Sequence, residues 1–499
     1  MDFSGIILGA TAAFSAYNLL YCLIGCFLGT AIGVLPGLGP VATISMLLPI
    51  TFGLPPETAL IMLAGIFYGA QYGGSTTAIL VNLPGEASSV VTALDGYQMA
   101  RQGKGGQALA TAAIGSFIAG TLATLLVGFV APILSLFALK FGPAEYFSLM
   151  VLGLIAAIVL AHGSVLHAFG MMLLGLLLGL VGTDVNSGVQ RFTGGTPQLL
   201  DGISFVIVAM GIFGIGEIIA NLGDRKSENT QLAQITRLMP TLSELRAMLP
   251  PVLRGTALGS VLGILPGGGA TLASFSAYAL EKKVSSKPEE FGHGALAGLA
   301  GPESANNAAA QTSFIPMLTL GIPSNPVMAL MIGALIMQGI QPGPSVIHEQ
   351  PMLFWAIVIS MWIGNVMLLV LNLPLIGIWV KMISVRYSLL FPAILVFCAV
   401  GVFSINKSLF DVYLMVGFGL AGYMLRRLDC EPAPLLLGFI LGPMMEEYLR
   451  RAMLLAKGDP TVFLTHPISA VMLLIAAVLL LTMAAPAVRR KREEAFVEE

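Results

Sequence analysis

The stretch Gly29–Gly39, GTAIGVLPGLG, interrupts an apolar run with one proline and four glycines. A closely similar stretch, GSVLGILPGGG, recurs at Gly259–Gly269. Proline and glycine break helices, and a bilayer offers no partners for the N–H and C=O groups that a break frees. Such breaks are tolerated only where protein buries them or where they line a watery cavity. The two stretches therefore predict broken or re-entrant helices around a binding site, as in a secondary transporter.

A second interruption follows each of these stretches. Residues Gly73–Glu86 read GGSTTAILVNLPGE, and residues Asn307–Asn325 read NAAAQTSFIPMLTLGIPSN. Both segments carry hydroxyl and amide side chains close to a proline within apolar surroundings. Paired interruptions at corresponding places in two halves are the best sequence indication of a transporter's binding site.

The interruptions recur at nearly constant spacing. Pro36 and Pro266 are 230 positions apart, and Pro84 and Pro323 are 239 positions apart. This spacing predicts two homologous halves and leaves open whether they are inverted. The predicted organisation is a first membrane repeat, a cytoplasmic connector, a second membrane repeat and a charged cytoplasmic tail, at residues 1–222, 223–250, 251–488 and 489–499.

The composition is that of a membrane protein. The 499 residues are 56% hydrophobic and 10% charged, with a mean hydropathy of +0.89. A soluble globular domain carries about 25% charged residues, so a water-soluble protein is excluded. The net charge of −2 gives no electrostatic footprint for nucleic acid. We predict an all-α polytopic integral membrane protein with about 10 to 14 transmembrane segments, re-entrant hairpins included.

Basic residues indicate how the chain is oriented. The polar break at 223–254 holds five basic residues against three acids, and the basic run Arg489–Arg492 follows the last apolar run. Both are expected on the cytoplasmic side. Arg450 and Arg451 then fall on the opposite side, one span earlier. Either the segment 432–447 re-enters the membrane, or the predicted number of spans is wrong by one.

The proline–glycine turns have the properties of an anion site. Helix ends at such a tip leave N–H groups free, and these stabilise anions, carboxylates included. The alternative for the glycines before each proline is close packing between helices, the GxxxG pattern. The predicted substrate-binding residues are Pro36, Gly37, Gly39, Ser75, Thr76, Pro266, Gly267, Gly269, Ser324 and Asn325.

Oxygen-bearing side chains near the breaks favour a small cation as coupling ion. Sodium is favoured over a proton because amides and hydroxyls outnumber buried acids there, and no other metal or cofactor is predicted. The alternative for each hydroxyl is a hydrogen bond back to its own helix. The predicted coupling-ion residues are Thr77, Asn82, Glu86, Asn306, Asn307 and Thr319.

Acids within apolar stretches are functional candidates by default. Glu86 and Glu303 lie beside the breaks and are the stronger candidates; Asp184 and Glu217 are others. Asp95 falls in the more polar patch DGYQMARQGKGG, which is typical of a solvated loop.

Several motifs are absent from the sequence. GxxxxGK[ST] is missing, so ATP is not the direct energy source in this chain, and HExxH and GxSxG are missing too. The sequence therefore predicts a protein that is not an enzyme. A carboxylate channel or uncoupled facilitator, and a membrane-embedded enzyme or scaffold, remain as alternatives.

Five segments together resemble a known family. They are GVLPGLGPVATISMLLP (33–49), FYGAQYGGSTTAILVNLPGE (67–86), ILPGGGATLASFSAY (264–278), GPESANNAAAQTSFIPMLTLGIPSN (301–325) and LGFILGPMMEEYLRRA (437–452). The chain resembles the large membrane subunit of tripartite tricarboxylate transporters, the TctA type, over nearly its whole length.

The resemblance implies a multi-pass permease subunit in the bacterial inner membrane. Its implied partners are a small membrane subunit of the TctB type and a periplasmic solute-binding protein of the TctC type. It further implies uptake of carboxylates such as citrate, coupled to Na+ or protons. We hypothesise an elevator-like or rocking movement in which the two hairpin tips carry substrate and Na+ together.

Overall fold

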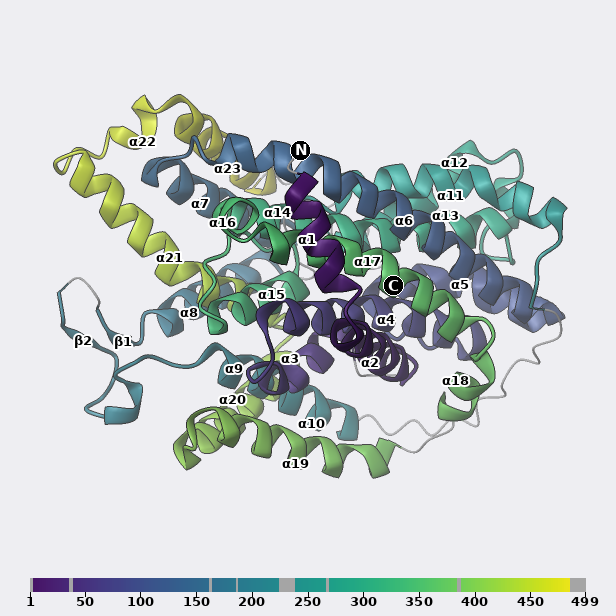
Figure 1. Cartoon of the computed structure of the whole chain (residues 1–499), viewed down its shortest axis with the longest axis horizontal. Helices are drawn as coiled ribbons and strands as arrows, with labels where there is room; N and C mark the ends of the chain where they lie inside the picture. Colours follow the sequence, from purple (N-terminus) through teal and green to yellow (C-terminus); the bar gives the residue numbers. More distant parts are fainter. Residues whose placement is uncertain are drawn as a thin grey trace.

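The computed structural model of the chain is all-α, as predicted (Figure 1). It describes residues 3–35, 39–160, 164–184, 187–223, 238–265, 269–383 and 387–484. The tail at 489–499 and half of the connector at 223–250, residues 224–237, therefore lie outside the described residues. So do Pro36, Gly37, Pro266 and Gly267, which the sequence places at the two predicted hairpin tips.

The first part of the chain ends at residue 223. Its elements are α1 (Phe3–Ala13), α2 (Ala16–Gly33), α3 (Pro40–Thr51), α4 (Pro56–Val81), η1 (Ala87–Ser89), α5 (Val90–Met99), η2 (Ala100–Lys104), α6 (Gly105–Ala138), α7 (Pro143–Leu160), α8 (Val165–Gly179), β1 (Gly182–Thr183), β2 (Gln190–Arg191), η3 (Pro197–Leu199), α9 (Phe205–Ala209), η4 (Met210–Ile215) and α10 (Gly216–Gly223). Strands β1 and β2 pair as a small antiparallel hairpin.

The second part begins at residue 242. Its elements are α11 (Leu242–Leu262), α12 (Gly269–Val284), η5 (Pro288–Glu290), α13 (Leu296–Thr312), α14 (Phe314–Leu320), α15 (Pro326–Met337), α16 (Ser345–Glu349), α17 (Pro351–Asn372), α18 (Ile376–Ile383), α19 (Tyr387–Asn406), α20 (Leu409–Arg427), α21 (Ala433–Leu455), α22 (Val462–Thr465) and α23 (Pro467–Ala484).

Full-length and half-length helices are mixed in this fold. In the described part of the chain, four helical segments are long and apolar enough to cross a membrane, namely Ala16–Gly33, Ala87–Ala138, Pro351–Asn372 and Leu409–Arg427. By contrast α3 and α15 have 12 residues each. Twelve residues rise about 18 Å, which is too short for an apolar core of about 30 Å. The chain is thus a multi-pass membrane protein with half-length helices, and its number of crossings stays a prediction.

Two long apolar stretches are each one continuous helix. The run 107–139 lies within α6, which passes through Pro132 without a break. The segment 432–447 lies within α21, which continues through Pro443 as far as Leu455. The apolar run 107–139 is therefore one long helix up to Ala138 and not a pair of helices broken near Pro132.

Glycines bring two pairs of helices into backbone contact. In the pair α2 and α4, a Cβ added to Gly29 would overlap the carbonyl of Ile66. In the pair α11 and α13, a Cβ added to Gly259 would overlap the carbonyl of Ala305. Close backbone approach through small residues is how helices associate tightly in membranes. The glycines before each proline therefore pack helices together, which was the alternative to a role in binding.

The helices α4 and α14, one from each half, also end alike. Asn82 ends α4 and Gly321 ends α14, both in the left-handed region with φ of 57° and 70°. Glu86 and Asn325 then precede the next helices, both extended with φ of −154° and −156°. Asn82 and Gly321, like Glu86 and Asn325, are 239 positions apart. The local geometry is thus repeated, while the division of the whole chain into two repeats stays a prediction.

The two halves lie against each other along α6 and α13. Helix α6 contacts α11 and α13 of the second half, and α13 also contacts α4 and α5 of the first. Figure 1 shows α6 running along one side of the molecule next to α11 and α13. Residues of both halves therefore meet around α13.

We predict that Gly259→Ala destabilises the protein although alanine is the better helix former. The new methyl group has to displace the Ala305 carbonyl, and overpacking of this kind costs about 1–3 kcal/mol. Gly417→Ala in α20 is the matched control, because a Cβ there meets no atom within 4 Å. Thermal unfolding in detergent should show a lower midpoint for Gly259→Ala alone. Equal midpoints would contradict the close packing of α11 on α13.

Candidate functional site

A central cavity of about 800 Å³ is lined by residues from both halves of the chain. Its walls include the segments 39–41, 84–88, 269–271 and 325–327, together with Glu217 and Arg426. Each of these four segments lies at one of the interruptions that the sequence predicted to surround a site. The structure thus brings the residues flanking all four interruptions to one cavity.

Four helices begin at this cavity. Helix α3 follows Gly39, α12 starts at Gly269, α15 follows Asn325 and the short helix η1 follows Glu86. The first N–H groups of an α-helix have no partner within that helix, and the helix dipole adds about half a positive charge there. The three-residue turn η1 adds the N–H groups of Ala87 and Ser88, because that of Ser89 already bonds to the Glu86 side chain. These beginnings give the cavity an environment that favours an anionic ligand.

Asn325 and Gly269 hold two of these helix beginnings next to each other. The Asn325 Oδ1 accepts a hydrogen bond of 3.0 Å from the Met328 N–H and so caps α15. Gly269 has φ of +45°, in the left-handed region that favours glycine, and a Cβ there would lie 3.5 Å from the Asn325 Cβ. Asn325 therefore serves the fold as a cap in addition to facing the cavity.

Glu86 contributes a carboxylate without a basic partner. Its Oε1 accepts hydrogen bonds from the Ser88 hydroxyl at 2.5 Å and from the Asn306 Nδ2 at 3.4 Å. Within the described ranges no lysine, arginine or histidine forms an ion pair with it. The buried Oδ1 of Asn306 has no hydrogen-bond partner. An acid and an unused amide oxygen thus lie together at the wall of the cavity.

The cavity lining also carries a base that is already paired. Arg426 donates to the Glu217 carboxylate at 3.1 Å, and among the described residues of the lining it is the one base. Asp184, another acid that the sequence singled out, pairs with Arg450 at 3.2 Å outside the cavity. Glu217 and Asp184 are therefore both members of ion pairs within the protein, and these pairs are enough to explain two of the acids that lie in apolar stretches.

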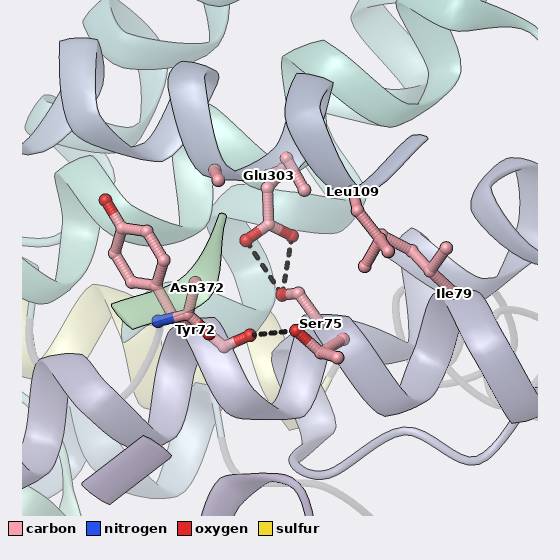
Figure 2. A pocket seen from close by; sticks show the side chains of 9 residues that line it. Tyr72, Ser75, Ile79, Leu109, Glu303 and Asn372 are labelled. Atoms are coloured by element: carbon pink, nitrogen blue, oxygen red, sulfur yellow. Dashed lines mark hydrogen bonds between the residues drawn. The ribbon is translucent and has the colours of Figure 1, made fainter. Parts of the chain in front are cut away.

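A second acid, Glu303, lies on α13 behind the cavity wall. The Ser75 hydroxyl is 2.8 Å from each of its two carboxylate oxygens (Figure 2). The Thr92 hydroxyl donates to Oε2 at 2.7 Å, and the Ser116 hydroxyl and the Asn307 Nδ2 reach Oε1 at 3.2 Å. The Glu303 side chain is completely buried. Residues from α4, α5, α6 and α13 therefore converge on this one carboxylate.

The predicted substrate-binding residues fall into three groups. Gly39, Gly269 and Asn325 line the central cavity. Ser75 and Thr76 instead line a small cavity of about 10 Å³ beside Glu303, and Ser324 is buried with its hydroxyl 3.5 Å from the Ser313 carbonyl. Pro36, Gly37, Pro266 and Gly267 lie outside the described residues.

The predicted coupling-ion residues separate into those near the two acids and those that bond to their own helix. Asn306 contacts Glu86, and Asn307 contacts Glu303. The hydroxyls of Thr77 and Thr319 donate to carbonyls of their own helices, those of Gly74 and Ile315. Asn82 is exposed at the end of α4. The roles predicted for all six residues stay predictions.

Sequence reasoning missed the side chains that complete the two acid clusters. Ser88, Thr92 and Ser116 hydrogen-bond to Glu86 or Glu303, and none was singled out. Thr92 and Ser116 lie on α5 and α6, where no proline–glycine turn marks them. Ser88 could have been found, because it stands two positions after Glu86 beside the break.

The interpretation of Asp95 as part of a solvated loop is wrong. Asp95 lies in α5 and is completely buried. Its Oδ1 accepts hydrogen bonds from the backbone N–H groups of Gly292, Gly294 and Ala295 at 2.8–2.9 Å. The carboxylate anchors the loop before α13, a long-range contact that the local polarity of the patch does not reveal.

Comparison with known proteins assigns the chain to a family. Residues 19–437 match the Tripartite tricarboxylate transporter TctA family. The chain belongs to the TctA family. This confirms the family resemblance stated from the motifs, and it makes the chain a member of a transporter family.

Two relatives of this TctA member come from Agrobacterium vitis. The chain is 59% identical over 496 residues to an uncharacterised 52.8 kDa protein in the TAR-I ttuC' 3' region, covering 99% of both chains. It is 61% identical over 241 residues to an uncharacterised protein in the TAR-II ttuC' 3' region, covering 48% of this chain and all of the relative. No solved structure is significantly similar to this chain.

We predict that Asn325→Ala lowers the stability of this TctA member while Asn325→Asp does not. Alanine removes the side-chain cap of α15, which costs about 1 kcal/mol, whereas aspartate keeps an acceptor for the Met328 N–H. Thermal unfolding in detergent measures both variants against the unmodified protein. If both variants unfold at the same temperature, Asn325 does not act as a cap.

Proposed function

We propose that the chain is the large permease subunit of a binding-protein-dependent secondary transporter in the bacterial inner membrane. It imports tricarboxylates or dicarboxylates of the citrate type together with Na+. A small membrane subunit of the TctB type and a periplasmic solute-binding protein of the TctC type complete the complex. Membership of a tripartite transporter family supports the architecture, and the cavity supports the choice of an anionic substrate.

The observation that carries the proposal is the convergence of helix beginnings on one cavity. The starts of α3, α12, α15 and η1 all face it. A carboxylate placed there accepts hydrogen bonds from backbone N–H groups and is stabilised by the helix dipoles. A cavity of about 800 Å³ is within the usual range for small-molecule sites.

Glu86 supplies a physical reason for coupling the anion to a cation. An ionised carboxylate at the cavity wall repels a carboxylate ligand, since like charges nearby are unfavourable. A cation bound at Glu86 removes that repulsion, so that each ligand strengthens the binding of the other. We propose Na+ as this cation. The Asn306 Nδ2 now donates to Glu86, and a turn of this amide would present its Oδ1, which has no hydrogen-bond partner, to such a cation.

We propose further that transport is elevator-like, with the two hairpin tips carrying substrate and Na+ together. Each tip connects to a helix pair, α2 with α4 or α11 with α13, whose backbones touch through glycines. Helices packed in this way are suited to moving as a unit. The half-length helices α3 and α15, whose first residues face the cavity, would move with their tips.

Uptake into proteoliposomes tests the proposed function. The complete three-component complex should accumulate a subset of a carboxylate panel only with an inward Na+ gradient, and the rate should saturate with substrate. Omitting the binding protein should abolish uptake. Unsaturable flux that needs neither the binding protein nor a gradient would instead identify a channel or facilitator.

Glu86→Gln should weaken the coupling between sodium and the carboxylate. The neutral amide no longer repels the anion when Na+ is absent, so binding without Na+ becomes tighter and Na+ adds less. Coupling between two ligands is usually about 5- to 150-fold, and the variant should bring the ratio of carboxylate Kd values without and with Na+ close to one. Glu57→Gln, at the start of α4, is the control for charge removal. An unchanged ratio in Glu86→Gln would contradict this role of Glu86.

Asn325→Asp should leave the protein folded but weaken its binding of the carboxylate substrate. The cap remains, but the added negative charge faces the cavity beside the anion. We expect the carboxylate Kd to rise about tenfold or more, which corresponds to about 1.4 kcal/mol. Equilibrium binding by calorimetry at saturating Na+ measures the change. An unaltered Kd would show that the start of α15 is not part of the anion site.

A further inference from the structure

Among the described residues, Glu303 differs from the two other carboxylates that are completely buried, Glu281 and Asp95. Glu281 pairs with Arg254. Asp95 accepts three backbone N–H groups. Glu303 has neither arrangement, because all its hydrogen-bond partners are neutral side chains. A buried charge without a counter-charge is costly, so this site calls for neutralisation by a cation.

Among the described residues, no basic side chain on the elements packed around Glu303 pairs with its carboxylate. Helix α6 has no ionisable residue, and α13 has Glu303 alone. The titratable and charged groups on the other neighbouring elements are Glu57, Tyr68 and Tyr72 of α4, Glu86 before η1, Asp95 and Tyr97 of α5, Glu244, Arg246 and Arg254 of α11, and Tyr278, Glu281, Lys282 and Lys283 of α12. In the described part of the chain none of the basic groups among them forms an ion pair with Glu303.

The hydroxyl of Ser75 can serve both protonation states of Glu303. It lies 2.8 Å from both carboxylate oxygens and 3.1 Å from the Gln71 carbonyl of its own helix. When Glu303 is ionised, the Ser75 O–H donates to the carboxylate. When Glu303 is protonated, its O–H donates to Ser75 Oγ, and the Ser75 hydrogen turns to the Gln71 carbonyl. The cluster stays satisfied in either state.

The space around Glu303 favours a proton over a metal ion. Four side chains already approach the carboxylate at 2.7–3.2 Å, and one of them, Asn307, directs an N–H group at it. The adjoining cavity of about 10 Å³ has room for about one water molecule. A bound proton needs no additional volume, and a single water there can deliver it.

We propose that Glu303 is a second coupling site that binds one proton per transport cycle. The proton adds to a carboxylate oxygen from water on one side of the membrane and leaves to water on the other side. Neighbouring residues tie this site to the cavity, because Asn306 contacts Glu86 and Asn307 contacts Glu303. This inference rests on the proposed cation-coupled uptake.

The test uses Glu303→Gln in the complete reconstituted complex. Glutamine resembles the protonated acid but cannot release a proton. At saturating Na+, the uptake rate of the unmodified complex should change with pH by about tenfold or more, and that of the variant by less than about twofold. An imposed inward proton gradient should raise accumulation in the unmodified complex and leave the variant unaffected, with the same half-saturating Na+ in both.

Control variants separate this role from a structural one. Glu281→Gln removes another buried carboxylate close to α13 and should keep the pH profile of the unmodified complex. If Glu303→Gln fails to assemble, Ser75→Ala keeps the acid, removes the switching hydroxyl and should shift the pH midpoint of uptake. An unshifted midpoint in Ser75→Ala would count against the switch.

The outcomes distinguish this inference from the proposed function. Carboxylate uptake that responds to Na+ but not to a proton gradient in the unmodified complex overturns the proton site alone. Proton-driven accumulation that persists in Glu303→Gln also overturns it. Absence of carboxylate uptake under every gradient would overturn the proposed function itself.

Discussion

The fold depends on the need to satisfy backbone groups where helices end at membrane depth. Lipid cannot partner the N–H and C=O groups that a break in a helix frees, so broken helices have to be packed against protein or opened to water. Here both solutions occur. Glycines bring α2 onto α4 and α11 onto α13 at backbone contact, and the helices that follow the breaks start at a shared cavity. Free N–H groups are thereby gathered where an anion can use them.

The region around the cavity also contains two carboxylates that have no basic partner. Glu86 lies at the cavity wall and Glu303 lies one layer behind it, linked through the adjacent residues Asn306 and Asn307. Glu281, Glu217 and Asp184 have arginine partners, whereas Glu86 and Glu303 form no ion pair with any described residue. In the function that we propose, this combination of an anion site with uncompensated acids makes substrate binding depend on cations, which is the coupling that symport requires.

The sequence predicted the fold class, the family and the importance of the interruptions, because a proline–glycine turn inside an apolar run frees backbone groups that lipid cannot satisfy. It also singled out Gly39, Gly269, Glu86 and Asn325, which line the cavity, because their positions beside the breaks are a local property. Their binding roles stay predictions. It could not predict Thr92 and Ser116, which reach Glu303 from helices with no local signal. The prediction for Asp95 failed for the same reason, since its partners lie about 200 positions away in the chain. Contacts between distant helices require the structure.

The most direct test of the central claim is an experimental density map of the assembled complex with citrate and Na+ bound. We expect density for a carboxylate within hydrogen-bond distance of the N–H groups of Ala87, Ser88 and Val327, in the cavity shared by α3, α12, α15 and η1. A map in which this cavity is empty and the substrate occupies another place would contradict it, as would beginnings of α3 and α12 that face lipid on opposite sides.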